Sequence, residues 1–230
     1  TEVLSKTGSN TLFVATDSAF TEFYKNNPWG VRKYEDLSYA QKSLILNYGM
    51  LNNAYLVDML ANFNNGGLRE GAAMRRQTSV SVLDSVPYTK GNQIPKTNYW
   101  DFYRTNGMYL LKDNTPLTLM YFTEAHMVQN MISDRDFSII TGLTRSENDA
   151  HLFGIKIIKK DITCKNGYLN ILEKVMIPPV NMAEYISTSS NTSVFADVLN
   201  RFCAPYFDSE NTIRYRQLNP SFGDSIFVKR

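Results

Sequence analysis

The sequence predicts a mixed α+β domain, and three observations carry that prediction. A short apolar run at residues 12–15 has the length of a buried strand. Apolar residues then recur at intervals of three and four over residues 37–51, as they do along one face of a helix. Polar and apolar residues alternate over residues 155–162, which is the period of a strand. Helices and strands in separate blocks are typical of α+β folds.

The composition is that of an ordinary globular protein. The chain has 230 residues, of which 43% are hydrophobic and 20% charged, so it can bury a full core. Its net charge of +2, without a concentrated basic stripe, argues against a nucleic-acid partner. No stretch approaches the ~18 consecutive apolar residues of a membrane-spanning helix. We therefore predict no transmembrane segment in this chain.

The residues after the first strand predict a sharp turn into a helix. Thr16 and Asp17 offer side-chain oxygens that can cap the helix that follows. Phe20 precedes Phe23 by three residues and Tyr24 by four, so this helix presents an aromatic face.

A second helix is predicted further along the chain. Ser38 and Gln41 have the spacing of a capping box, and Leu44 and Tyr48 continue the apolar face. Tyr48 is therefore assigned to the core. A further apolar stripe at residues 56–63 predicts another helix.

Two strand signals follow in the middle of the chain. Residues 79–82 alternate between polar and apolar side chains. Asn106 and Gly107, between residues 100–105 and 108–111, form the strongest short signal for a β-hairpin.

The next segment is predicted to be an elaboration packed on the main domain. It covers residues 117–142, with a helix after Thr123, and Phe137, Ile139 and Ile140 are expected to be buried.

The last part of the chain contains a predicted hairpin and a predicted domain end. Asn166 and Gly167 turn the chain between two strands. Pro178 and Pro179 end the domain, because consecutive prolines cannot continue a strand ladder. Residues 181–230 then read as a linker, an amphipathic helix and a short final strand.

Two stretches resemble the signatures of fasciclin-like domains, the fasciclin/beta-Ig-H3 family. Residues 11–20 read Thr-Leu-Phe-Val-Ala-Thr-Asp-Ser-Ala-Phe, against the family's Thr-Val-Phe-Ala-Pro-Thr-Asp-x-Ala-Phe. The matching positions include Thr11, Phe13, Thr16, Asp17 and Phe20. Asp161-Ile162, followed by Asn-Gly-Tyr-Leu-Asn-Ile-Leu-Glu-Lys-Val-Met-Ile-Pro-Pro at residues 166–179, is similar to the closing signature, although Asn170 occupies the family's His position.

The resemblance implies a fasciclin-like domain over residues 1–180, built as a β-sandwich or wedge of short strands with flanking helices. The leading helices of that domain would lie outside this chain. Residues 181–230 would open a second fasciclin-like repeat or form a C-terminal extension. The resemblance also implies an exported bacterial protein with tandem repeats. It would be attached to the cell surface or outer membrane as a lipoprotein, or be extracellular or periplasmic.

The implied function is adhesion, that is, binding of a protein or glycan partner at the cell surface. In the family, the Asp-Ile dipeptide is linked to integrin-type adhesion, and Asp161 and Ile162 match it. The structural alternative, which the sequence favours, buries Ile162 in the core and uses Asp161 to begin a turn. Gly49 follows Tyr48 where the family usually has Tyr-His, so the adhesive role of that motif does not transfer.

Tyr99, Trp100 and Tyr103 form a second candidate binding site. Exposed aromatic faces stack on sugar rings or anchor a protein partner. The alternative, again favoured, is that alternate members of this run point into the core.

Catalytic, cofactor and metal sites are not predicted. The sequence contains none of the common nucleophile, phosphate-binding or dinucleotide-binding motifs, and His126 and His151 lack a metal-ligand pattern around them. Cys164 and Cys203 are read as independent thiols rather than a disulfide. Two other functions compete with binding: a hydrolase or glycan-processing accessory with a cleft in residues 98–142, and a structural spacer.

Overall fold

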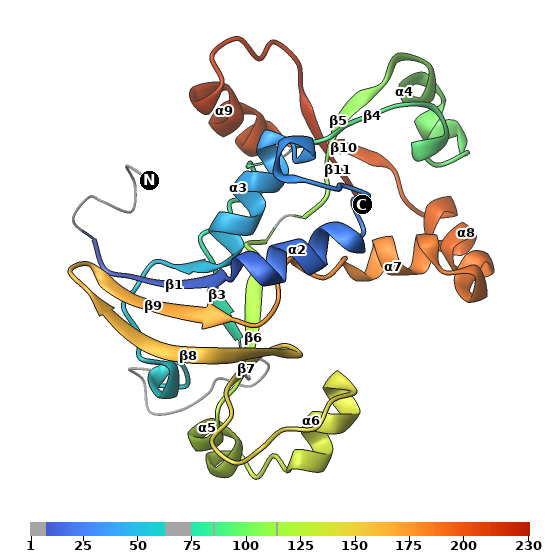
Figure 1. Ribbon diagram of the computed structural model, residues 1–230. Helices are drawn as coiled ribbons and strands as arrows, with labels where there is room; N and C mark the ends of the chain where they lie inside the picture. Colours follow the sequence, from blue (N-terminus) through green and yellow to red (C-terminus); the bar gives the residue numbers. More distant parts are fainter. Residues whose placement is uncertain (1–7, 63–74, 85, 114) are drawn as a thin grey trace. The chain divides into compact units, whose positions relative to one another are not determined.

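The computed structural model describes residues 8–62, 75–84, 86–113 and 115–230, which form two compact units (Figure 1). The first unit comprises described residues of Thr1–Val80 and Leu117–Pro178. The second comprises those of Ser81–Pro116 and Pro179–Arg230. Each unit is thus assembled from two separate stretches of the chain, and together they contain helices and mixed sheets, which confirms the predicted α+β class.

A sheet of seven strands, counted over the described residues, forms the first unit in the order β2, β1, β9, β8, β7, β6, β3. Its strands are β1 (Asn10–Ala15), β2 (Met50–Leu51), β3 (Arg75–Gln77), β6 (Thr118–Phe122), β7 (His151–Leu152), β8 (Ile155–Cys164) and β9 (Gly167–Leu172). Neighbouring strands are antiparallel except β1 and β9, which run parallel.

The two stretches that resemble fasciclin signatures therefore lie side by side in the sheet (Figure 1). Leu12 of β1 is opposite Leu169 of β9, and Asn10 is opposite Gly167. A Cβ atom at residue 167 would lie 1.8 Å from the carbonyl oxygen of Asn10, and Gly167 also has a φ of 137°. Only glycine fits both conditions. The predicted turn at Asn166 and Gly167, which joins β8 to β9, is confirmed.

Two helices follow the sequence signals closely. Helix α2 (Asp17–Lys25) is capped by Thr16, whose side chain accepts a hydrogen bond from the Ala19 amide. Helix α3 (Tyr39–Tyr48) begins with the predicted capping box between Ser38 and Gln41. Both N-terminal predictions are confirmed.

The core of the first unit lies between this sheet and its helices. Tyr48 is fully buried, as predicted, and its hydroxyl donates to the Thr118 carbonyl at 3.1 Å. The predicted helix at residues 56–63 shortens to the 3₁₀ turn η2 (Val57–Met59), and its last residue is outside the described part. The other buried members of the core are Phe13, Leu51, Val57, Leu60, Val80, Leu119, Tyr121, Ala150, Leu152, Ile157, Leu172 and Met176.

Helices α5 (Glu124–Gln129) and α6 (Asp134–Thr141) form a small satellite of the first unit (Figure 1). Phe137 is buried, as predicted, and it packs with Phe122 and Met127. Ile139 and Ile140 are 72% and 58% exposed, so the prediction that they are buried is wrong. The short helix α6 presents only one face to the small core, and Phe137 occupies it.

The second unit contains a four-stranded sheet in the order β10, β11, β5, β4, counted over the described residues. Its elements are β4 (Tyr88–Thr89), η3 (Gly91–Gln93), η4 (Asn98–Trp100), α4 (Asp101–Asn106), β5 (Met108–Leu111), α7 (Met182–Thr188), η5 (Ser190–Thr192), α8 (Ser193–Arg201), β10 (Pro205–Phe207), α9 (Ser209–Leu218) and β11 (Ile226–Lys229). The predicted amphipathic helix and final strand are thus present as α8 and β11. Whether they open a second fasciclin-like repeat stays a prediction.

Two strand predictions in the middle of the chain are wrong. Residues 101–106 form helix α4, and Asn106-Gly107 ends it instead of turning a hairpin. Asn-Gly suits the end of a helix as well as a hairpin, because both need a backbone that glycine adopts readily. Residues 79–82 form no strand, because a turn begins at Ser81, whose amide donates to the Asp84 carboxylate at 3.0 Å.

Replacing Gly167 by alanine should destabilise the first unit strongly. The added Cβ must displace the Asn10 carbonyl and so disturb the pairing of β1 with β9. We expect Gly167→Ala to lower the free energy of unfolding by about 3 kcal/mol or more in urea denaturation. The matched control is Gly223→Ala, whose added Cβ meets no atom within 4 Å and should cost less than about 0.5 kcal/mol. Equal effects for the two variants would contradict this explanation.

Stability should also fall at mildly acidic pH because of two buried histidines. Burial lowers the pKa of His126 below its usual value of 6.5. Burial likewise lowers the pKa of His151, although Asp149 and Glu173 oppose the shift. Between the folded pKa values and 6.5, the unfolded chain binds more protons than the folded one. The free energy of unfolding is therefore expected to decrease as the pH falls through this window.

Urea denaturation between about pH 7.5 and about pH 5 measures the effect, because carboxylates titrate mainly below this range. A His126→Gln, His151→Gln double variant is the control and should show a flatter dependence. If the double variant keeps the slope of the wild type, the histidines are not its cause.

Candidate binding groove

Asp161, the first predicted binding residue, is held by structural hydrogen bonds. It has a φ of 59° and lies at a register shift in β8, between Lys159 and Ile162. Its amide donates to the Asn170 side-chain oxygen at 2.8 Å, and its carboxylate accepts from the Val57 amide at 2.9 Å. These contacts join β8 to β9 and to η2. The adhesive role of Asp161 and of the half-buried Ile162 stays a prediction.

The other signature residues also support the fold. The Thr11 hydroxyl donates to the Asn53 carbonyl at 2.8 Å and accepts from the Tyr55 amide at 2.7 Å. Phe13 is buried in the core, and Pro178 is the last residue of the first unit. Asp17 is the first residue of α2, and Phe20 lies on the side of α2 that faces α3. Pro179 is the first residue of the second unit.

Gly49 lies where a side chain has no room, at the position that is usually histidine in the family that the sequence resembles. A Cβ atom at residue 49 would lie 2.6 Å from the Phe13 carbonyl oxygen, and the Phe13 amide donates to the Gly49 carbonyl at 2.7 Å. The end of α3 therefore lies directly against β1, where a side chain would not fit.

The aromatic run in the second unit does not form one exposed platform. Trp100 is fully buried, and its indole NH donates to the Cys203 carbonyl at 3.0 Å. The prediction that Trp100 binds a partner is therefore wrong, because its ring is inside the core. Tyr103 is half-buried against Phe227, whereas Tyr99 is 69% exposed.

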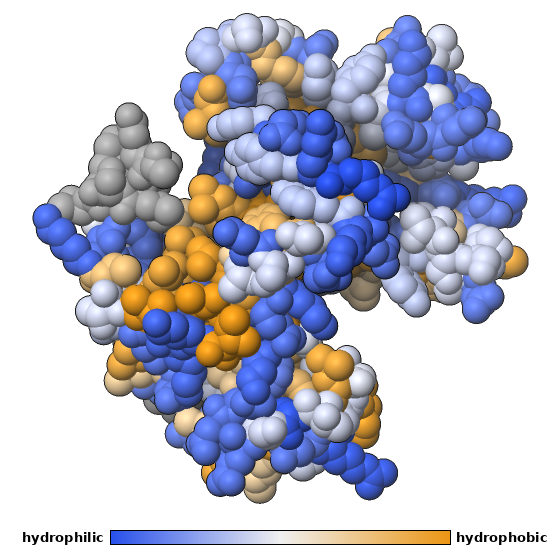
Figure 2. Space-filling model, in the orientation of Figure 1, coloured by the Kyte–Doolittle hydropathy of each residue, from blue (hydrophilic) through white to orange (hydrophobic). Residues whose placement is uncertain are grey.

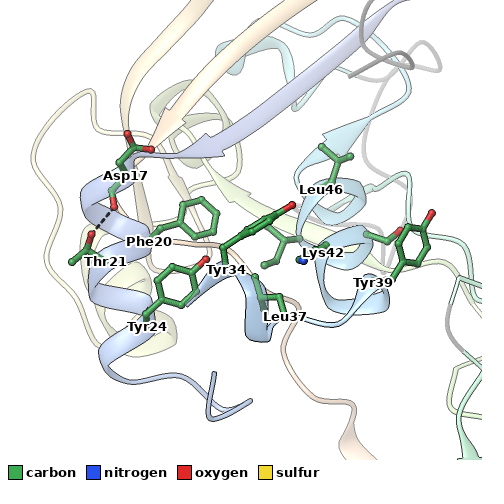
Figure 3. A pocket seen from close by; sticks show the side chains of 11 residues that line it. Asp17, Phe20, Thr21, Tyr24, Tyr34, Leu37, Tyr39, Lys42 and Leu46 are labelled. Atoms are coloured by element: carbon green, nitrogen blue, oxygen red, sulfur yellow. Dashed lines mark hydrogen bonds between the residues drawn. The ribbon is translucent and has the colours of Figure 1, made fainter. Parts of the chain in front are cut away.

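A groove that the sequence did not predict lies between α2, the 3₁₀ turn η1 (Tyr34–Asp36) and α3 (Figure 3). Its volume is about 790 Å³. Its walls carry aromatic and aliphatic side chains and one lysine. The residues that line it are Asp17, Phe20, Thr21, Tyr24, Tyr34, Leu37, Tyr39, Lys42, Ser43, Ile45 and Leu46. We call it the α2–α3 groove.

Three tyrosines and one lysine shape this groove. Phe20 and Tyr24 point from α2 toward Tyr34, and the ammonium of Lys42 lies 4.1 Å from the centre of the Tyr34 ring (Figure 3). Tyr34 is 60% exposed and Tyr39 is 88% exposed. Their rings therefore offer large apolar area to an incoming molecule, which tyrosine does at low entropic cost.

The Tyr24 hydroxyl remains a hydrogen-bond donor at neutral pH. Burial raises the pKa of Tyr24, and the nearby charges of Glu35 and Asp36, together with Tyr34, raise it further. A neutral hydroxyl in this position can donate to an acceptor on a bound molecule.

A second cavity of about 200 Å³ continues the groove toward the sheet. It shares Phe20, Lys42, Ile45 and Leu46 with the first cavity. Beyond them it reaches apolar residues of β1 and of the segment after β9, including Leu12, Val14, Val175 and Met176.

An apolar surface lies over β1 and β9 in the space-filling view (Figure 2). The side chains of Leu12 and Val14 alternate with buried ones, and they are half-buried opposite Leu169 and Ile171. The apolar character of the groove thus extends onto the outer face of the sheet.

A local signal in the sequence could have revealed the groove. Leu44, Ile45 and Leu46 are consecutive, and three successive residues of a helix cannot all face one core. Leu44 packs against the core, whereas Ile45 and Leu46 line the groove. A helix with apolar residues beyond its core-facing stripe indicates a second contact surface.

The described residues offer no grouped chemistry for catalysis by a metal. Among them, no cluster of three or more His, Cys, Asp or Glu side chains is placed to hold a metal ion. Cys164 is exposed and Cys203 is buried, and both are free thiols, which agrees with the sequence interpretation. No helix in the described part of the chain is long and apolar enough to cross a membrane.

Comparison with solved structures gives several matches, among them a pair of FAS1 domains. The solved structure of a FAS1 domain pair from the insect cell adhesion molecule fasciclin I is similar to this chain, with 12% identity and a TM-score of 0.37. The match covers 85% of this chain and 46% of the insect chain, so this chain spans less than half of its length. No protein-family model matches the sequence, and no curated protein is similar to it.

A structural role for Asp161 predicts a loss of stability upon substitution. Asp161→Ala removes the acceptor for the Val57 amide and places alanine at a positive φ, so we expect a loss of about 2 kcal/mol. Asp161→Asn keeps an oxygen acceptor and tolerates this backbone, so it should cost less than about 1 kcal/mol. Chemical denaturation of both variants measures the difference, and an unchanged stability of Asp161→Ala would contradict the structural role.

Proposed function

We propose that this chain is a non-catalytic binding domain of fasciclin-like type, and that it contacts a protein partner through the α2–α3 groove. The observation that carries the proposal is the pair of exposed tyrosines, Tyr34 and Tyr39, above an apolar groove. The fasciclin-like assignment is supported by the two signatures. In the first unit, Thr16 caps helix α2, Phe13 lies in the core, and the strands that carry the two signatures pair with each other.

The chemistry of the groove favours a protein over a small polar ligand. Phe20, Leu37, Ile45 and Leu46 provide apolar walls that gain free energy when water is removed from them. Exposed tyrosines beside such walls are typical of the residues that dominate protein interfaces. A partner that inserts bulky apolar side chains would bury both features at once.

The remaining proposals follow from the same family resemblance. The fasciclin-like domain would end near Pro178, and the whole protein would be exported and act in adhesion at the cell surface. Residues 181–230 would then belong to a second fasciclin-like repeat or to a C-terminal extension, attached to a domain of the same kind.

A glycan partner is the second candidate, because the open faces of Tyr34 and Tyr39 can also stack on sugar rings. The alternative of a cleft in residues 98–142 has less support, since neither cavity described above contains a residue of that range. A plain spacer would have a featureless polar surface, whereas the groove and the apolar area over β1 and β9 (Figure 2) favour binding.

The proposal predicts that the groove tyrosines control binding. The chain is tested against immobilised matrix proteins and glycans, together with a Tyr34→Ala, Tyr39→Ala double variant. We expect saturable binding to a protein, weakened by at least about tenfold in the double variant, because buried tyrosines contribute about 1 to 2 kcal/mol each at such interfaces.

Tyr99→Ala is the matched control, because the 69% exposure of Tyr99 lies between those of Tyr34 and Tyr39 and the residue belongs to the second unit. Both variants are first shown to unfold at the same urea concentration as the wild type. Binding to a glycan alone would replace the protein partner by the second candidate. Binding that survives the double variant unchanged would exclude the groove as the contact site.

A further inference from the structure

Lys42 occupies a special place in the α2–α3 groove, and it suggests the chemistry of the partner. Its side chain lines both cavities, so it lies where the larger one meets the smaller one. It is half-buried, and its ammonium lies against the face of the Tyr34 ring. The surrounding walls are apolar, with Ile45 and Leu46 on the same helix.

Lys42 forms no ion pair with a carboxylate among the residues that the structure describes, although the charges of Glu35 and Asp36 act on Tyr24 in the same groove. Within the described residues, other lysines such as Lys25 and Lys112 form ion pairs with glutamates, but none joins Lys42 to a carboxylate. The contact with Tyr34 holds the ammonium in place without cancelling its charge. Asp17, whose carboxylate also lines the groove, lies on the far side of Phe20 and Tyr34 from Lys42 (Figure 3).

We propose that the partner is a protein segment in which an acidic side chain stands between bulky apolar side chains, and that Lys42 binds the acidic group. This inference rests on the proposed role of the groove as the binding site. The apolar side chains enter the two cavities, of about 790 and 200 Å³, and the carboxylate meets the ammonium at their junction.

The position of Lys42 makes this ion pair useful for selection. A cation beside apolar walls is partly desolvated, so a carboxylate brought next to it interacts more strongly than it would in open water. A partner with an amide in place of the carboxylate would leave the ammonium covered and unpaired, which costs free energy. Lys42 therefore discriminates between acidic and neutral segments.

A peptide fits the groove better than the tail of a lipid. Tyr39 is 88% exposed and Tyr34 60% exposed, so the rims stand open to solvent instead of enclosing a chain. A peptide backbone passing between the rims can cover both rings and accept a hydrogen bond from the Tyr24 hydroxyl. Successive side chains of the peptide then supply the apolar and acidic groups.

The first experiment uses two dyes that differ in one charged group. 1-Anilinonaphthalene-8-sulfonate is anionic, and N-phenyl-1-naphthylamine has the same rings without the sulfonate. Fluorescence titration gives the affinity of each for the wild type, Lys42→Met, Lys42→Arg and Tyr39→Ala. We expect Lys42→Met to weaken binding of the anionic dye by about fivefold and Lys42→Arg to retain it. The neutral dye should bind both Lys42 variants with the affinity that it has for the wild type.

The second experiment uses two acetylated, amidated peptides, Tyr-Leu-Glu-Leu-Tyr and Tyr-Leu-Gln-Leu-Tyr. The Glu peptide should bind the wild type about three- to fivefold more tightly than the Gln peptide, and this preference should vanish in Lys42→Met. The preference should also shrink at high salt, which screens the pair. Dodecanoate serves as the lipid probe and is expected not to displace the Glu peptide.

The outcomes separate the inference from the proposed function. Equal affinity for the Glu and Gln peptides, with both lost in Tyr39→Ala, would overturn the role of Lys42 and leave the groove as the binding site. Displacement of the peptide by dodecanoate would assign the groove to a lipid and overturn the peptide partner. If no dye or peptide binds the wild type, the groove itself fails as a binding site, and the inference fails with it.

Discussion

The parallel pairing of β1 with β9 is the contact on which the first unit depends. Parallel strands cannot be joined by a tight turn, and the other five strands that the structure describes in this sheet lie between β1 and β9 in the sequence. Gly167 permits this pairing, because any side chain there would collide with the Asn10 carbonyl. Strand β1 also contacts the end of α3, because the Phe13 amide donates a hydrogen bond to the Gly49 carbonyl. The position of both groove helices therefore follows from β1.

Buried polar groups reinforce this arrangement where apolar packing alone would leave the register open. Thr11 bonds the segment before η2, while Asp161 bonds both Asn170 and the Val57 amide. Asn170, which occupies the histidine position of the resembling family, is fully buried beneath them. Each of these groups is costly to bury without a partner, so together they favour one register of β8 on β9. Asp161, a candidate adhesion residue, thus has a structural role, which is the alternative that the sequence favoured.

The α2–α3 groove arises because these same elements leave one face of α3 uncovered. Leu44 faces the core, but Ile45 and Leu46 turn toward α2, from which aromatic residues approach. Tyr34 completes the wall and holds Lys42 in the groove. Apolar walls contribute affinity with little selectivity, whereas a charge held between them selects partners that carry the opposite charge. The combination supports a recognition role more readily than a catalytic one.

The sequence by itself determined the features that depend on neighbours in the chain: the α+β class, the cap at Thr16, the capping box at Ser38 and the turn at Gly167. Such signals are local, because caps and tight turns are closed by residues a few positions apart. Only the tertiary structure decided that Trp100 is buried and that the run around it is helical, since that choice depends on a distant carbonyl. The groove was decided in the same way. Its walls come from separate elements, and no periodicity within one segment specifies how two helices lie across a strand.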